Sequence, residues 1–428
     1  YLPDLIEKEA EIFGNRTLSG FLSQVGAEES MASDQVVWSE QGRLHLHYKN
    51  CTVSTNTITM VNETDGNTSV STHAVRVGDM VLISDANATI QAFVSAVAAD
   101  TITVLPYKHA NIAGAGVAST TDVSVLVYGS EYVKGAVGRA GANAPTFQSY
   151  TNKPIILRDK YEISGSDASA IGWVEVSGED GQNGYLWYLK AEGDTRARFS
   201  DYLEMSMLES VKATLTVTAL ESGAEGTIQG TEGLFAAIEA RGNQTTGVTG
   251  VNAATDLAEF DAILAEFDKN GAIEENMLFV DRSTSLAFDD MLASMNSYGA
   301  GGTSYGVFNN SEDMALNLGF SGFRRGSYDF YKSDWKYLNQ QDGRGGMIDT
   351  VSNIRGAIIP AGTSSVYDQQ LGKNLKRPFL HVRYRASQTE SRKLKTWITG
   401  SVGAVTSDLD AMEVHYLSER CLVTQGAN

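Results

Sequence analysis

The residues of this chain best suited to metal binding are its six histidines, His45, His47, His73, His109, His381 and His415. His45 and His47 alternate along an expected strand, so their side chains would share one face and could supply two metal ligands. The sequence offers no third ligand beside them, and we interpret both as partly exposed strand residues. His381 and His415 also lie in alternating stretches, and we interpret them as packing or interface residues.

The glycine-rich residues 299–306 are the part of the chain most similar to a phosphate-binding loop. Such loops lead into a helix whose N-terminus holds the anion, whereas this stretch follows an expected helix, so we interpret it as a flexible loop. Asp408 and Asp410 lack the other ligands of a calcium loop and are expected to be solvated turn carboxylates. The sequence contains no HExxH, P-loop or GxSxG motif. We therefore expect no catalytic residue, no cofactor site and no metal site, and a protein that is not an enzyme.

The bulk composition indicates a folded protein of several units. The chain has 428 residues, 42% apolar and 20% charged, which predicts two to four folded units. The net charge of −19 argues against nucleic-acid binding through a broad basic face. It still allows a container that encloses nucleic acid without gripping it. The two cysteines, Cys51 and Cys421, lie near opposite ends of the chain, and we expect reduced thiols.

Residues 49–130 differ in composition from the rest of the chain. Threonine, valine, serine, alanine and asparagine dominate, lysine and arginine are rare, and short β-like runs recur at residues 57–61, 79–83, 91–97, 101–105 and 123–128. Turn residues separate these runs at the intervals found in small barrels and sandwiches. The pattern predicts an inserted β-barrel or sandwich module.

Residues 131–211 predict an extended arm that leads into a long helix. The arm, residues 131–180, is expected to be a hairpin with a glycine- and alanine-rich tip, and its strand-like residues 151–164 have few partners nearby in sequence. Residues 185–208 carry opposite charges four positions apart, with Lys190 before Asp194, Glu192 before Arg196, and Asp194 before Arg198. A helix of that length would span about 40 Å.

The remaining segments predict a mixed α/β organisation. Helices are expected over residues 231–241, 255–269 and 283–296, with a buried strand at 277–280 between two of them. Alternating residues at 379–385 and 412–418 predict a return to β structure, residues 35–48 predict a hairpin, and residues 3–13 predict a short amphipathic helix.

This order of parts resembles the major capsid protein family of tailed bacteriophages, with its Hong Kong 97-type fold. The stretches 152–164, 184–199, 270–280 and 412–428 carry the resemblance. The resemblance implies an α+β fold with an N-terminal arm (1–48), an extended loop (131–180), a spine helix (181–230), an axial domain (231–378) and C-terminal strands of a peripheral domain (379–428). Residues 49–130 depart from the simplest family pattern and form the inserted module.

The resemblance also implies a function. Copies would assemble as hexamers and pentamers into an icosahedral head shell around double-stranded DNA, in the virion capsid, after assembly in the host cytoplasm. Other copies of the chain are the main partners. A scaffold, a portal, a maturation protease and a decoration protein are further expected partners, and no contact with a membrane is expected. Family members often lose an N-terminal segment, which would fit a first residue, Tyr1, that is not methionine. The alternatives are an encapsulin-like nanocompartment shell and a secreted β-rich hydrolase or carbohydrate-binding protein.

Seven basic residues are candidates for contacts between subunits: Lys134, Arg139, Lys153, Arg158, Lys160, Arg196 and Arg198. The first five give the arm a positive balance in an acidic chain, so the arm either presents a solvated face or docks on an acidic surface of a neighbour. The last two pair either along the helix or across a subunit boundary. Gly193, within the helix, predicts close approach of another element, because a glycine there otherwise costs about 1 kcal/mol relative to alanine.

Overall fold

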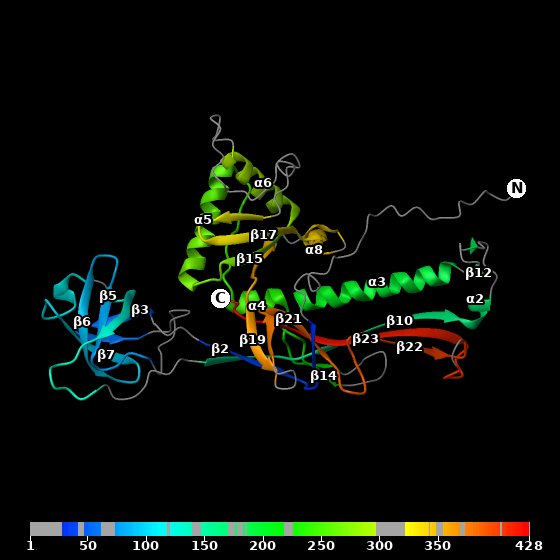
Figure 1. The fold of residues 1–428 in the computed structure, drawn as a ribbon, viewed down its shortest axis with the longest axis horizontal. Coiled ribbons are helices and arrows are strands. Elements are labelled where there is room, and N and C mark those ends of the chain that lie inside the picture. Colours follow the sequence, from blue (N-terminus) through cyan, green and yellow to red (C-terminus); the bar gives the residue numbers. More distant parts are fainter. Residues whose placement is uncertain are drawn as a thin grey trace. The chain divides into compact units, whose positions relative to one another are not determined.

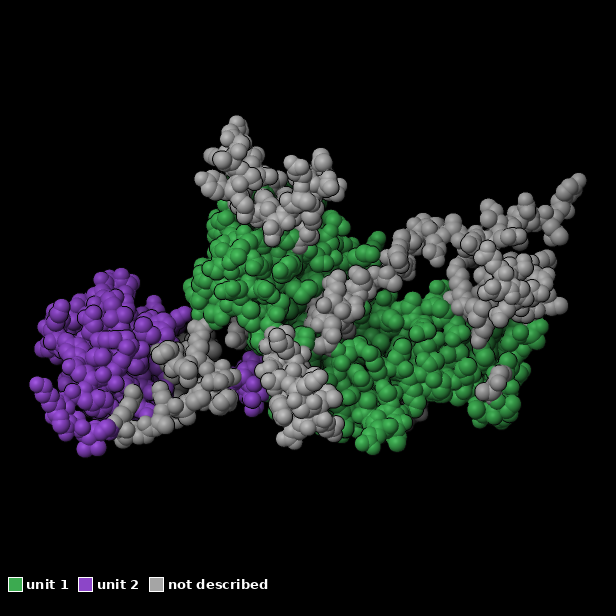
Figure 2. Space-filling model, in the orientation of Figure 1, with its two compact units in different colours: residues 1–38, 151–428 green, residues 39–150 purple. Residues whose placement is uncertain are grey.

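The computed structural model describes residues 28–41, 47–60, 73–117, 120–138, 147–169, 176–177, 183–184, 186–217, 226–296, 322–341, 343–347, 354–368, 373–402 and 405–427. The chain divides into two compact units (Figure 2). In the text the first unit is residues 39–150, purple and keyed as unit 2 in the figure, and the second unit is residues 1–38 and 151–428, green and keyed as unit 1. The expected helix at residues 3–13 lies outside the described residues. Within the described residues, no helix combines the length and the apolar character needed to cross a membrane.

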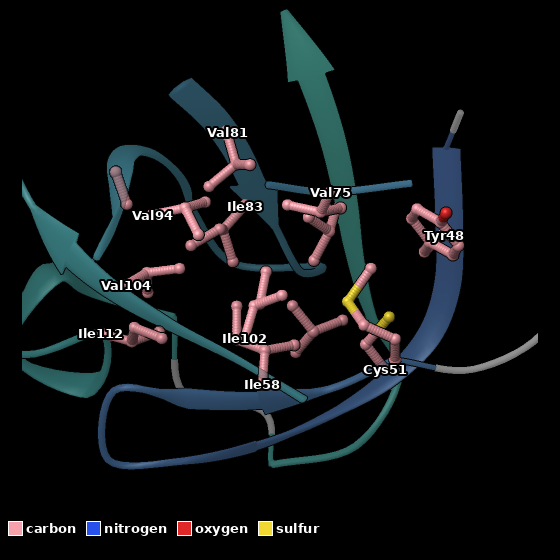
Figure 3. Packing of buried hydrophobic residues seen from close by; sticks show 14 of the residues in the cluster. Tyr48, Cys51, Ile58, Val75, Val81, Ile83, Val94, Ile102, Val104 and Ile112 are labelled. Atoms are coloured by element: carbon pink, nitrogen blue, oxygen red, sulfur yellow. The ribbon is translucent and has the colours of Figure 1, made fainter. Parts of the chain in front are cut away.

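Six strands of the first unit form a closed barrel in the order β3-β4-β7-β6-β5-β8. They are β3 (His47–Ser54), β4 (Thr57–Thr59), β5 (Asp79–Ser84), β6 (Thr89–Val97), β7 (Thr101–Pro106) and β8 (Val123–Ser130), and a short 3-10 turn η1 (Ala113–Ala115) precedes β8. Alternating apolar residues such as Ile58, Ile83 and Ile102 point into the interior (Figure 3). Among the residues that the structure describes, the sixteen buried apolar side chains of this core come from residues 48–125.

The barrel lies in the chain between two strands that pair with each other. These strands are β2 (Val36–Gln41) and β9 (Phe147–Asn152). The expected hairpin at residues 35–48 is therefore wrong, because β2 pairs with β9 and β3 belongs to the barrel. Alternation in the sequence predicts that a strand forms and which residues share a face, but it does not identify the partner strand.

A five-stranded sheet forms the base of the second unit (Figure 1). Its strands are β1 (Glu28–Met31), β10 (Ile155–Ser164), β21 (Leu380–Arg385), β22 (Lys395–Gly400) and β23 (Ala411–Thr424). β10 runs antiparallel to β23 over ten residue pairs, from Ile155 opposite Arg420 to Ser164 opposite Ala411. β22 and β21 pair with the other edge of β23, and β1 is parallel to β21.

This pairing corrects the expected hairpin of residues 131–180. The two long strands in that range pair outside it, β9 with β2 and β10 with β23. The partner of β10 is thus a strand of the same chain about 250 residues further on, and β10 is not an uncovered arm. Short-range pattern analysis does not detect this contact, because its sequence separation is far larger than any hairpin loop.

The long helix α3 (Leu186–Glu209) lies along the sheet (Figure 1). Its 24 residues span about 36 Å. Phe199 and Leu203 point down between β10 and β23, where Phe199 packs on Tyr416 with ring centroids 5.9 Å apart. One turn further on, Met207 and Leu208 enter a second core, so the helix joins two packed regions of the unit.

Two expectations about α3 can be compared with the structure. A Cβ added to Gly193 would meet no described atom of the same chain within 4 Å, so a close approach at this glycine stays a prediction about another copy. Arg198 pairs with Asp159 of β10, 2.9 Å away, and not with Asp194 one helical turn before it. The sheet beneath the helix offers Arg198 a carboxylate that helical spacing alone could not reveal.

The α/β part of the second unit contains a four-stranded sheet in the order β16-β17-β15-β18. These strands are β16 (Gly322–Arg325), β17 (Tyr328–Asp334), β15 (Glu275–Val280) and β18 (Gly356–Pro360), and helices α4 (Leu234–Arg241), α5 (Ala253–Asn270) and α6 (Arg282–Asn296) accompany them. Asn252 caps α5 by accepting from the amide of Thr255, and Gly271 ends it with a left-handed φ of 64°. Phe260 of α5 lies at the centre of an aromatic cluster with Phe288, Phe323 and Phe330.

Short elements complete the second unit. They are α2 (Gly165–Ser169), α8 (Lys336–Asn339), η2 (Arg344–Gly346) and three two-stranded ribbons, β11 (Val176–Ser177) with β12 (Asn183–Gly184), β13 (Leu215–Val217) with β14 (Gly226–Ile228), and β19 (Thr363–Asp368) with β20 (Lys373–Pro378).

One buried side chain, Asn152, connects three of these segments. Its amide nitrogen donates to the carbonyls of Leu422 in β23, at 2.7 Å, and of Glu232 before α4, at 3.0 Å. Its oxygen accepts from the hydroxyl of Thr231 and the amide of Glu232. Because the amide is fully paired while buried, it fixes the start of β10 against β23 and α4.

Candidate assembly surface

The strand β10 has two different faces. Leu157, Tyr161 and Ile163 point toward α3 and join its apolar core. Arg158 and Lys160 alternate with them and are exposed on the opposite side of the sheet. A sheet with one packed and one solvated face produces this alternation, and the solvated face is free to contact another molecule.

The side of β10, β23 and β22 opposite α3 carries residues in three cross-strand rows, in which Leu417 is buried and the other members are exposed or half-buried. We call these nine residues the ladder face: Arg158, Leu417 and Lys395; Lys160, His415 and Trp397; Glu162, Glu413 and Thr399. Side chains directly opposite each other in such rows lie within contact distance. The ladder face is thus an ordered set of charges arranged around one aromatic residue.

Trp397 is the centre of the ladder face. Its ring stacks on that of His415, with centroids 5.1 Å apart and an angle of 17° between the planes. The guanidinium carbon of Arg158 lies 5.8 Å from the indole centroid, and the ammonium of Lys395 lies 5.7 Å from it. Cations placed over an indole ring are attracted by its quadrupole, so these side chains are held in position on the exposed face.

Hydrogen bonds fix the third row and the histidine. The hydroxyl of Thr399 donates to Glu413 at 3.0 Å, and it lies 2.7 Å from Nε2 of His415. A hydroxyl has one proton to donate, so Thr399 accepts from His415, and Nε2 carries a proton. Lys160 donates to Glu162 at 2.9 Å and to Glu413 at 3.1 Å. These hydrogen bonds raise the pKa of Lys160, and the bond from Lys160 lowers the pKa of Glu413.

The helix-facing side of the same strands carries a separate charge network. The hydrogen bond from Arg198 to Asp159 raises the pKa of the guanidinium. Burial, followed by the charge of Glu192, raises the pKa of Tyr161. Arg198 is therefore engaged between α3 and β10, on the side away from the ladder face.

Acidic residues tie the N-terminal strand β1 to basic residues of the sheet. Glu29 pairs with Arg383 of β21 at 2.8 Å, and Glu28 pairs with Lys393. Glu28 also lies 4.0 Å from the buried guanidinium of Arg420, whose pKa is lowered by burial. Asp34 follows the strand and pairs with Arg385. The edge of the sheet beside β21 is thus closed by an acidic segment on a basic strip.

The structure places the seven predicted contact residues in different surroundings. Arg158 and Lys160 lie together on the ladder face. Lys153 donates to the side chain of Gln229 within the same unit. Lys134 and Arg196 are exposed on separate elements. Of the two others, Arg198 pairs with Asp159, and Arg139 lies outside the described residues.

Sequence reasoning missed the aromatic centre of this surface. Trp397 and Lys395 belong to β22, a strand that the sequence analysis did not predict. The run of β-branched and aromatic residues from Thr396 to Thr399 is a strand signal in the sequence that could have revealed it. The expectation for His415 as a packing or interface residue agrees with its place under the indole ring.

The residues first considered for chemistry form no site in the described part of the chain. His47 is half-buried on β3, where burial and then Lys49 lower its pKa, and His45 lies outside the described residues. Asp408 and Asp410 are exposed before β23, and residues 299–306 are outside the described ranges. Among residues that the structure describes, no group of three or more histidine, cysteine or acidic side chains could hold a metal ion.

No protein-family model matches the chain, and no curated protein matches it. Solved structures are matched by shape. The capsid structure of the cyanophage P-SCSP1u gives a TM-score of 0.39 at 8% identity, over 99% of this chain and 90% of that chain. The Microbacterium phage Oxtober96 structure gives a TM-score of 0.41 at 8% identity, over 98% of this chain and 90% of that chain. The asymmetric unit of the bacteriophage PhiM1 mature capsid gives a TM-score of 0.40 at 8% identity, over 99% of this chain and 87% of that chain.

The chain is thus similar to phage capsid structures, as the sequence resemblance predicts.

Proposed function

We propose that this protein is a shell-forming structural protein, the major capsid protein of a tailed bacteriophage. Copies assemble as hexamers and pentamers into an icosahedral head around double-stranded DNA. The protein encloses the DNA without sequence-specific binding, in keeping with its net charge of −19. Its partners are other copies of itself, and assembly takes place in the host cytoplasm.

The observation that carries this proposal is the two-sided layer of α3, β10 and β23. One side of the sheet is packed on a 24-residue helix through Phe199 and Leu203. The other side presents the ladder face, on which Arg158 and Lys160 are exposed. Among the described strands, β10 pairs only with β23, so its second edge is available as well. A layer with an ordered face and a free edge supports contacts with further copies.

Different segments of the chain have different roles in the proposed shell. The α/β region 231–378 forms the contacts around the hexamer and pentamer axes. The spine helix, β10 and the strands of residues 379–428 form the peripheral part, whose ladder face contacts neighbouring copies. Each contact is modest in area and repeated many times, so the stability of the shell is collective.

The direct test is electron microscopy of the full chain expressed alone and with candidate scaffold proteins from the same genome. Closed icosahedral shells with six- and five-fold clusters are the expected result. A monodisperse monomer under all of these conditions would overturn the proposal. A small closed shell that packages a protein cargo in place of DNA would instead identify a nanocompartment.

The role of the ladder face can be tested by charge reversal. Arg158→Glu is expected to lower the shell yield by about tenfold, because a lost charge contact between copies is worth about 1.4 kcal/mol or more. Lys49→Glu, an equal charge change at an exposed site of the barrel, is the control and should leave the yield unchanged. Thermal unfolding of unassembled protein should be the same for both variants. Equal yields would exclude Arg158 from the contact.

A further inference from the structure

An apolar row crosses the outside of the barrel. Met80 of β5 pairs with Phe93 of β6, and Phe93 pairs with Leu105 of β7. On its other side Met80 is opposite Gly129 of β8, and the methyl group of Met80 lies over that glycine, 2.8 Å from where a Cβ would stand. The β-bulge at this point leaves Tyr128 without a paired residue. The outer positions of a solvated barrel are normally polar, so this row calls for an explanation.

A second row continues the apolar surface. Leu82 of β5 is opposite Leu126 of β8; Leu82 lies between buried Val81 and Ile83, and Leu126 follows buried Val125, so both point outward. We define the barrel stripe as Met80, Leu82, Phe93, Leu105, Leu126 and Tyr128. Polar residues border it, with Ser84 and Thr89 on one side and Thr103 on the other. An apolar centre with a polar rim is the composition of a protein–protein interface.

Tyrosines extend the stripe at one end. Tyr107 is 48% exposed, Tyr128 is 49% exposed and Tyr132 is 46% exposed, next to Leu105 at 52%. The hydroxyl of Tyr107 donates to Glu131 at 2.5 Å, and this bond raises the pKa of the phenol to about 12. Tyrosines with a bound hydroxyl and an exposed ring are common anchors of interfaces.

The charge of the barrel unit favours contact between copies. Residues 39–150 contain eight acidic and six basic residues, a net charge of −2, whereas the whole chain carries −19. The negative charge outside the barrel unit makes two copies repel each other electrostatically, whereas the barrel units themselves repel only weakly. Exposed Glu131 and Lys134 flank Tyr132, so charges of both signs lie at the end of the stripe and can pair across a two-fold contact.

We propose that the barrel stripe of one copy packs against the barrel stripe of a second copy. The exposed halves of three tyrosine side chains supply about 300 Å² of apolar area per copy. A stable dimer needs about 800 Å² per partner, so a single contact of this kind is weak. It becomes effective where many copies are held close together, and in this respect the inference rests on the proposed shell function.

Cysteine cross-linking tests this contact, because the chain has only two native cysteines and both are fully buried. Leu105→Cys places one accessible thiol on the stripe. Thr52→Cys places one on β3, at an exposed strand position outside the stripe, and serves as the control. Treatment of assembled full-length protein with a short bismaleimide is expected to convert most Leu105→Cys chains to dimers and few Thr52→Cys chains.

Each outcome decides between the alternatives. Shells that form normally but give no Leu105→Cys dimers, or equal amounts with both variants, overturn the stripe contact and leave the shell function standing. Absence of any assembly refutes the shell function itself. Tyr128→Ser in assembled particles provides a second readout: loss of Leu105→Cys cross-linking by several-fold supports the contact, and unchanged cross-linking contradicts it.

Discussion

The barrel and the five-stranded sheet differ in how their edge strands are satisfied. Every barrel strand has a neighbour on both sides, because the sheet closes on itself. In the open sheet, β1 covers one edge of β21 by parallel strand pairing, and β10 has β23 as its partner among the described strands. The barrel is complete within one copy, whereas the open sheet retains an edge and an exposed face that further copies can use.

The two regions also draw on different parts of the sequence. The barrel core comes from residues 48–125 alone, so its contacts are comparatively local. The sheet combines β1 near the start of the chain, β10, and three strands after residue 379. Contacts of such large separation form late and cooperatively, because loop closure must precede them. We therefore expect the stability of the barrel to be independent of the two ends of the chain. The stability of the sheet should depend on both ends, because strands from both ends form it.

Removal of β23 is the strongest test of this difference. Deletion of residues 411–428 removes the only described partner of β10 and half of the helix-facing core. We expect the second unit to lose cooperative unfolding while the barrel keeps its own transition, as measured by calorimetry and by amide protection. In the control, replacement of residues 42–146 by a short glycine–serine linker should leave the second unit folded. Two intact transitions after the β23 deletion would refute the assignment.

The packing of α3 on the sheet predicts the next largest effect. Phe199 is 1% exposed and packs against Tyr416, so Phe199→Ala should destabilise the second unit by about 3–5 kcal/mol and leave the barrel unchanged. Tyr202→Ala on the exposed side of the same helix is the matched control and should cost less than about 1 kcal/mol. Urea denaturation followed separately for the two units measures both; equal losses would mean that α3 is not held by this contact.

The pH dependence of the second unit should come in part from Glu204 of α3. Burial, with a smaller effect of Asp201 and an opposing effect of Arg420, raises the pKa of Glu204 to about 7. Because the folded state then binds the proton more tightly than the unfolded chain, stability should fall as pH rises from about 4.5 to about 7.

Glu204→Gln should remove this fall and raise the free energy of unfolding at pH 8 by roughly 2 kcal/mol, less than the full pKa shift implies, because the carboxyl is partly exposed and screened by solvent. Asp201→Asn is the control and should change stability by less. Denaturation midpoints between pH 5 and pH 8 measure the slope, and an unaltered slope in the glutamine variant would assign the titration to another group.

The smallest predicted effect concerns the exposed surface of α3. Gly193→Ala should stabilise the second unit by about 1 kcal/mol, because the added methyl group meets no neighbour and the helix loses a flexible residue. Ala197→Gly, at an exposed position one turn further on, should destabilise it by a similar amount. If Gly193→Ala blocks assembly while stabilising the free protein, another copy packs against this turn of the helix.

Local signals in the sequence predicted several elements well. The charged helix expected at residues 185–208 is α3 at Leu186–Glu209, and the helix expected at residues 255–269 is α5, ended by Gly271. The buried strand expected at 277–280 is part of β15, the strand between β17 and β18. In each case caps, helical periodicity or an apolar run lie within the element, so nearby residues determine it.

Partners distant in sequence were not predictable in this way. Alternation along β10 predicts that Arg158 and Lys160 share a face, but it does not identify β23 as the neighbouring strand or Trp397 as the residue beneath Arg158. The buried hydrogen bonds of Asn152 likewise depend on three segments that meet only in the folded chain.

The sequence by itself determined the local elements of this protein, the distinct composition of residues 49–130, and the absence of familiar catalytic motifs. Only the tertiary structure decided which strands pair, that Arg198 bonds to Asp159 and not along its helix, and that an apolar stripe lies on the outside of the barrel. The physical reason is that periodicity and caps act over a few residues. Strand pairing and burial depend on contacts between residues far apart in the chain.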